Sequence, residues 1–193
     1  AHAVSYAVVA YQTAYFKCHY PKEYMAALLT SVLDNTDKIV EYIAECKDCG
    51  IPLYPPDINH SAATFTVEQD GIRFGLVGIK NVGRGLIQAV VQERERGGAF
   101  TSMQNFCERM YGADLNKRAL ENLILSGAFD STGALRSQLH QIYEQVLSGV
   151  AESRKQNLEG QIDFFGGFSA EGPAQTSEIP LPNIPEFSAA ERM

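Results

Sequence analysis

Apolar positions three and four residues apart run through the first fifty residues of this chain and predict three helices. The first covers about residues 2–19 and carries a single apolar stripe. Pro21 begins the second, which reaches about residue 33. Asn35 or Thr36 caps the third, and Gly50 ends it. The stripes comprise Val4, Val8, Tyr11 and Tyr15 in the first helix and Ile39, Val40, Ile43 and Cys46 in the third.

The period then changes from helical to alternating. Residues 64–67 and 72–74 alternate apolar and polar side chains on either side of the turn sequence at 69–71. This arrangement predicts a β-hairpin.

Helical periodicity returns after a tight corner at residues 80–83, with Leu86, Ile87, Val90 and Val91 on one helix face. Residues 101–104 form a capping box for a helix that carries Phe106, and Asn116 caps another that stops at Gly127. A last helix is expected over residues 134–155. The chain then loses periodicity, which predicts a flexible linker over 156–193. The predicted fold is mainly α with a small β-hairpin.

The corner at residues 80–83 carries the most informative chemistry. Asn81 and Gly83 tolerate positive φ, so a sharp turn is possible there. The following helix begins with N–H groups that lack an intrahelical acceptor, and its dipole favours a phosphate. The spacing Ile79-x-x-Val82-Gly83 resembles the hairpin of a helix-hairpin-helix DNA-binding motif. Because glycine usually occupies the position of Asn81, we expect positive φ at this residue.

Charge is distributed unevenly along the chain. The net charge of −7 argues against a nucleic-acid partner. Between residues 73 and 118, however, eight basic and four acidic side chains give +4, whereas seven acidic and three basic residues from 151 onward give −4. This locally basic region is compatible with contact to a DNA backbone. No apolar run approaches the length of a membrane span, so no membrane partner is expected.

The four cysteines have several possible interpretations. No secretion signal accompanies them, which favours reduced thiols and a cytoplasmic location. Cys46 and Cys49 have C-x-x-C spacing, but no second ligand pair follows. Core or surface thiols are therefore preferred, and a metal site, a redox pair or a thiol enzyme are the alternatives.

The order of these segments resembles the alpha subunits of bacterial DNA polymerase III, the replicative C-family polymerases. Three of the matching strings are HYPKEYMAAL at 19–28, PPDIN at 55–59 and GIKNVG at 78–83. The others lie at residues 1–7, 11–15, 34–38 and 116–130. Because the chain lacks an initiator Met and opens within a helical pattern, we expect it to be a piece of a longer protein.

The resemblance implies four segments and three partners. Residues 1–60 would be a helical fingers segment, 61–133 a β-hairpin with a tandem helix-hairpin-helix module, 134–155 a helix and 156–193 a linker. The partners would be double-stranded DNA, a sliding clamp and the remainder of the polymerase chain. The fragment would hold no cofactor, because the parent's Mg ions would be bound upstream. No Asp-x-Asp pair occurs in the sequence, so we expect the fragment to be inactive.

Two groups of site residues are predicted. The expected DNA-binding residues are Lys80, Asn81, Val82, Gly83, Arg84 and Gly85, with Lys117 and Arg118 at a second hairpin. That second corner, at residues 126–129, is interpreted either as a degenerate hairpin or as a structural turn. Residues 161–165 resemble the clamp-binding peptide of bacterial replication proteins, in which Gln161, Phe164 and Phe165 would contact the clamp.

A different class of protein fits the same corner. A self-standing helix-hairpin-helix scaffold of a repair or recombination protein would also contain it. The fingers-like strings before residue 38 favour the polymerase interpretation.

Overall fold

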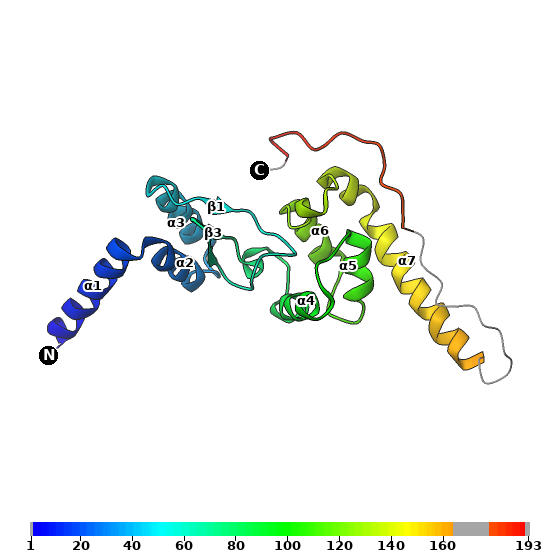
Figure 1. Ribbon diagram of the computed structural model, residues 1–193, viewed down its shortest axis with the longest axis horizontal. Helices are drawn as coiled ribbons and strands as arrows, with labels where there is room; N and C mark the ends of the chain where they lie inside the picture. Colours follow the sequence, from blue (N-terminus) through cyan, green and yellow to red (C-terminus); the bar gives the residue numbers. More distant parts are fainter. Residues whose placement is uncertain (1, 164–177, 192–193) are drawn as a thin grey trace. The chain divides into compact units, whose positions relative to one another are not determined.

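The computed structural model describes residues 2–163 and 178–191, and for residues 156–163 it describes the backbone alone. Over these residues the chain is mainly helical with one small sheet, which confirms the predicted fold class (Figure 1). The chain forms two compact units, residues 1–80 and 81–193.

Three helices make up most of the first unit: α1 (His2–His19), α2 (Pro21–Ser31) and α3 (Thr36–Asp48). Their boundaries follow from local sequence. Pro21 occupies the first turn of α2, where its missing N–H costs nothing. Asn35 caps α3, because its side-chain oxygen accepts a hydrogen bond from the N–H of Lys38 at 3.1 Å.

The sheet of the first unit has the order β1-β3-β2, with β1 (Leu53–Tyr54), β2 (Thr66–Glu68) and β3 (Gly71–Arg73). β2 and β3 form the predicted antiparallel hairpin, in which Val67 pairs with Ile72. β1 pairs in parallel with β3 and places Leu53 opposite Ile72. β1 was not predicted from the sequence, because two residues are too few to show alternation and the partner strand is distant along the chain.

The core of the first unit joins its helices to its sheet. It consists of Met25, Ala26, Leu29, Ile39, Cys46, Ile51, Phe65 and Ile72. The predicted inward position of Val40 is wrong, because this residue is 60% exposed. It follows Ile39 directly, and successive helical side chains point about 100° apart. α1 differs more, because it contains no buried residue and its apolar stripe lies exposed.

The division into units differs from the expected boundary near residue 60. The β-hairpin belongs with α2 and α3, because Phe65 and Ile72 share their core. β1 also ties β3 to the end of α3. The first unit therefore extends through the 3-10 helix Leu76–Gly78 to Lys80.

The second unit contains α4 (Arg84–Gly97), α5 (Met103–Arg109), α6 (Lys117–Leu125), the 3-10 helix Asp130–Thr132 and α7 (Arg136–Asp163). α7 packs against both α5 and α6. At the centre, the Phe106 ring meets Phe100 and Phe129 edge to face, at centroid distances of 5.0 and 5.2 Å. Such edge-to-face contacts are favoured over parallel stacking.

Side chains cap two helices of the second unit. Asn116 caps α6 as predicted, because its side-chain oxygen accepts from the N–H of Ala119 at 3.0 Å. The predicted capping box at 101–104 is displaced by one residue. The N-cap is Ser102, whose hydroxyl accepts from the N–H of Asn105 at 3.2 Å.

The expected linker over 156–193 differs from the structure in two places. α7 continues past residue 155 to Asp163. Residues 178–191 are also described, and part of this segment hydrogen-bonds to α5 and α7. Leu139, Ile142 and Val146 of α7 are buried, whereas Leu135, which precedes the helix, is exposed.

Candidate nucleic-acid interface

The corner at residues 80–83 has the backbone geometry that a hairpin requires. Asn81 has a φ of 60°, which confirms the expected positive φ. Val82 is buried, whereas Lys80, Asn81 and Gly83 are exposed. The buried Val82 side chain therefore anchors the corner, and the residues on either side of it face solvent.

α4 begins directly after this corner and has no side-chain cap. Its N-cap residue, Gly83, lies at φ −68° and ψ 145°. A Cβ placed on Gly83 would meet no atom within 4 Å beyond its chain neighbours. Gly83, Arg84 and Gly85 are all exposed. The positive end of this 14-residue helix is therefore open to an anion.

One carboxylate lies beside the start of α4. A Cβ placed on Gly85 would lie 3.8 Å from Oδ2 of Asp114, and Asp114 is exposed. A helix N-terminus attracts a carboxylate for the same electrostatic reason that it attracts a phosphate. Asp114 would therefore compete with any anion that binds at this position. The sequence pattern placed Asp114 in the basic region but could not show this proximity.

Lys117 and Arg118 begin α6 and are both exposed. The nitrogen of Lys117 lies 3.0 Å from a carboxylate oxygen of Glu144 on α7. The corner at 126–129 follows the other end of this nine-residue helix, about 12 Å away at 1.5 Å per residue. The two side chains therefore do not lie at that corner.

The corner at 126–129 forms a Schellman motif that closes α6. The N–H of Ala128 donates to the carbonyl of Leu123, and that of Gly127 to Ile124, each at 3.0 Å. Ala128 and Phe129 are buried. The Arg136 guanidinium, paired with Asp130, would collide with a Cβ on Gly127. These contacts favour the structural-turn interpretation over a second DNA hairpin.

Several cations of the basic region pair with carboxylates. In the first unit Arg73 pairs with Glu68. In the second, Arg96 and Arg109 both contact Glu93, at 2.7 and 3.1 Å. The hydrogen bond from Arg109 holds the pKa of Glu93 below its usual value. Glu93 is already counted in the net +4 of residues 73–118. Glu68 and Glu144 lie outside that window, so their pairs with Arg73 and Lys117 reduce the charge available to a nucleic acid below +4.

Two of the four thiols, Cys46 and Cys107, are buried, whereas Cys18 and Cys49 are exposed. Cys46 is buried, and desolvation raises the pKa of its thiol to about 11. Burial likewise raises the pKa of Cys107 to about 12. A reactive thiolate needs a lowered pKa, so a thiol enzyme that uses Cys46 is not supported.

Three other observations concern the described residues alone. Among residues 2–163 and 178–191, no group of three His, Cys, Asp or Glu side chains is arranged to hold a metal. No helix in that part of the chain is long and apolar enough to cross a membrane. Of the predicted clamp-binding residues, Gln161 lies in the part of α7 for which the backbone alone is described. Phe164 and Phe165 lie outside the described residues.

The corner and α4 define a class of protein. Residues 50–139 match the family described as the helix-hairpin-helix motif. The matched region runs from the end of α3 to the first turn of α7 and includes the whole candidate interface. A helix-hairpin-helix motif within residues 50–139 is thereby confirmed, and its assignment to the corner at 80–83 stays a prediction.

The chain is also similar to several longer proteins that share one name. The chain is 43% identical over 183 residues to the DNA polymerase III subunit alpha of Saccharopolyspora erythraea, and 42% identical over 183 residues to that of Thermus aquaticus. It is 42% identical over 178 residues to that of Escherichia coli K12. These matches cover 92–95% of this chain and confirm its resemblance to the alpha subunits. The chain spans 15% of the length of these relatives.

Proposed function

We propose that this chain is a non-catalytic segment of a replicative DNA-directed DNA polymerase and that it holds duplex DNA by the phosphate backbone. The observation that supports DNA binding is the exposed, uncapped start of α4 after a positive-φ corner. Its place within a helix-hairpin-helix match supports the same role. The polymerase relatives support the parent activity and do not favour a self-standing repair scaffold.

The contact would be electrostatic and independent of base sequence. The main-chain N–H groups of Gly83, Arg84 and Gly85 would approach one phosphate, and Lys80 and Arg84 would add positive charge. Neutralising phosphates releases counterions, so log affinity should fall with log salt by about 0.9 for each phosphate contacted. Lys117 and Arg118 remain proposed as weaker contacts at the start of α6.

The experiment is a salt titration of duplex binding by fluorescence anisotropy. The double substitution Lys80→Ala with Arg84→Ala should lower the affinity and reduce the salt slope by up to about 2. A matched control, Lys38→Ala with Arg96→Ala, removes the same charge from two side chains that pair with neighbouring carboxylates. Equal slopes for the double variant and the control would exclude the corner as the binding site.

The proposal that this segment is non-catalytic rests on the spacing of its acidic residues. Two-metal phosphoryl transfer needs carboxylates clustered about the nucleotide phosphates, and the sequence contains no Asp-x-Asp pair. The resemblance to the alpha subunits implies that Mg ions would be held by a part of the parent upstream of this segment. Nucleotide addition by the purified chain in a primer-extension assay would refute this proposal.

The clamp contact is a separate proposal. The motif at 161–165 follows the DNA-binding unit in sequence, and two adjacent aromatic residues in a polar segment suit an apolar pocket on a partner. Calorimetry with the cognate clamp should show that Phe164→Ala with Phe165→Ala abolishes binding. Phe168→Ala is the matched aromatic control and should bind as the wild type does. Equal affinity of all three proteins would exclude the motif.

The exposed stripe of α1 suits packing against the remainder of the polymerase chain. Val4 and Tyr11 are 70% and 71% exposed, and no residue of α1 is buried. Large apolar side chains gathered on one exposed helix are typical of a surface that another part of the protein covers.

A further inference from the structure

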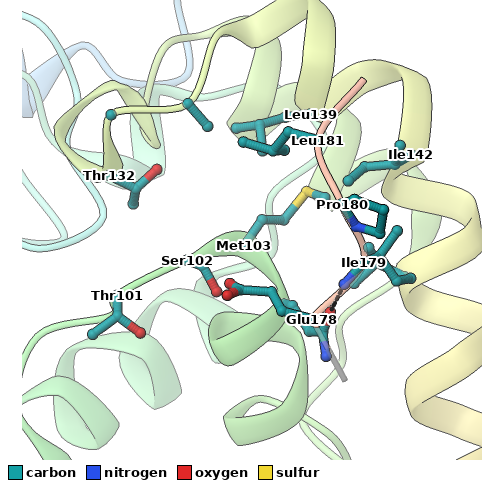
Figure 2. Close-up of a pocket in the computed structure, with 14 residues that line it drawn as sticks. Thr101, Ser102, Met103, Thr132, Leu139, Ile142, Glu178, Ile179, Pro180 and Leu181 are labelled. Carbon is teal, nitrogen blue, oxygen red and sulfur yellow. Dashed lines mark hydrogen bonds between the residues drawn. The ribbon is translucent and has the colours of Figure 1, made fainter. Parts of the chain in front are cut away.

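Residues 178–187 are called the strap below, and its first four residues line a groove between α5 and α7 in the second unit (Figure 2). The strap has an extended course without helix or strand. The N–H of Ile179 donates to the side-chain oxygen of Gln104 on α5 at 2.9 Å. The carbonyl of Pro182 accepts from the side-chain amide of Gln138 on α7 at 2.9 Å. Hydrogen bonds therefore attach the strap to both walls of the groove.

The far end of the strap caps α7. The two carboxylate oxygens of Glu186 accept from the N–H groups of Arg136 and Ser137, each at 3.0 Å. This satisfies two of the donors that a helix start leaves open and places a negative charge at the positive end of a 28-residue helix. The Phe187 ring packs edge to face on His140, with centroids 5.9 Å apart. One turn of α7 thus recognises both a carboxylate and an aromatic ring.

The composition of the strap suits a peptide ligand. Pro180, Pro182 and Pro185 restrict the chain to extended conformations, so little conformational entropy is lost when it docks. Proline also lacks an N–H that docking would leave unpaired. Extended, proline-containing peptides are a recurrent class of ligand for grooves of this kind.

The strap does not fill its groove. A cavity of about 440 Å³ remains among Met103, Leu139, Ile142, Ile179 and Leu181, and Figure 2 shows these side chains around the open space. The groove therefore offers apolar volume that the strap does not use.

We propose that the groove between α5 and α7 is a peptide-binding site for an extended, proline-containing segment with a carboxylate, and that the strap is its exchangeable ligand in cis. The carboxylate docks on the first turn of α7, and the aliphatic and proline residues lie along α5. The unused volume leaves room for another peptide of this chemistry to replace the strap. The inference does not depend on DNA or clamp binding.

The experiment adds a fluorescent peptide with the sequence of residues 178–191 to the full chain. In the chain variant Glu186→Gln the strap is weakened, so this variant should bind the peptide about tenfold more tightly than the wild-type chain does. A peptide that carries Glu186→Gln should bind that same variant about tenfold more weakly. Glu191→Gln is the matched control in chain and peptide, because Glu191 accepts from the N–H of Ser188 rather than from α7.

Equal binding of the two peptides, or equal binding by the wild-type and Glu186→Gln chains, would overturn the proposal. Amide exchange provides a second measurement that needs no added peptide. The N–H groups of Arg136 and Ser137 should exchange about tenfold faster in Glu186→Gln and at the wild-type rate in Glu191→Gln. Unchanged exchange in Glu186→Gln would likewise refute the role of the carboxylate.

Discussion

At the scale of single residues, Asn81 tests whether the corner is built as a hairpin. Its φ of 60° lies in the region where Asn and Gly are tolerated and β-branched residues are strained. Asn81→Val should therefore lower the free energy of unfolding by about 1–2 kcal/mol. Asn81→Gly should leave it within about 0.5 kcal/mol of the wild type. Urea unfolding of the two variants makes the comparison, and equal losses would contradict the geometry.

Asp114 is the residue whose removal should improve DNA binding. Its carboxylate lies beside Gly85 at the start of α4, where a phosphate is proposed to bind. Asp114→Asn should raise duplex affinity about two- to fivefold at low salt, since a charge at a helix end contributes about 0.3–1 kcal/mol. Glu95→Gln removes an exposed carboxylate near the other end of α4 and is the control. An effect of the same size in both variants would indicate net charge alone.

At the scale of elements, the sequence predicted helices well and their exposure poorly. Asn35 and Asn116 cap their helices as expected, because capping depends on residues three positions apart. α1 has the predicted bounds, yet its apolar stripe is exposed. β1 was missed because its pairing with β3 is non-local. Local rules set where elements begin and end, whereas burial depends on what packs against them.

A substitution at the start of α4 should change stability and duplex affinity in opposite directions. A side chain on Gly83 would meet no atom beyond its chain neighbours, and the backbone there is extended. Gly83→Asp should therefore cap α4 and stabilise the chain by a few tenths of a kcal/mol. The same carboxylate should occupy the phosphate position and lower duplex affinity at least fivefold. A variant that is more stable and still binds duplex DNA as tightly as the wild type would contradict the proposed site.

The ion pair of Glu93 and Arg109 should make α4–α5 packing sensitive to acid. The hydrogen bond from Arg109 lowers the pKa of Glu93, so its stabilising effect is fully present above the ordinary value of 4.5. The effect is lost as pH falls below 4.5 through the folded-state pKa. Between pH 6 and pH 3, the free energy of unfolding should therefore fall less in Glu93→Gln than in the wild type. Glu95→Gln, measured by the same urea titration, should follow the wild type.

At the scale of the whole molecule, the sequence predicted the order of the elements better than it predicted which elements pack together. The resemblance implied that the hairpin at 64–74 belongs to the DNA-binding module, and the helix-hairpin-helix match includes it. Its residues also complete a core with α2 and α3. The polar, proline-rich end was assigned to a flexible linker, yet Glu186 caps a helix that begins fifty positions earlier. Long-range contacts of this kind leave no periodic pattern in the sequence.

The uncapped start of α4 also has a thermodynamic consequence that needs no mutation. A ligand that supplies acceptors to those N–H groups binds the folded chain and has no equivalent site on the unfolded one. By mass action, duplex DNA at a hundred times its Kd would stabilise the folded state by about 2.7 kcal/mol. The unfolding midpoint should therefore rise with DNA concentration, and less so as salt is added. A thermal-shift titration would then rank DNA ligands without a label on either partner.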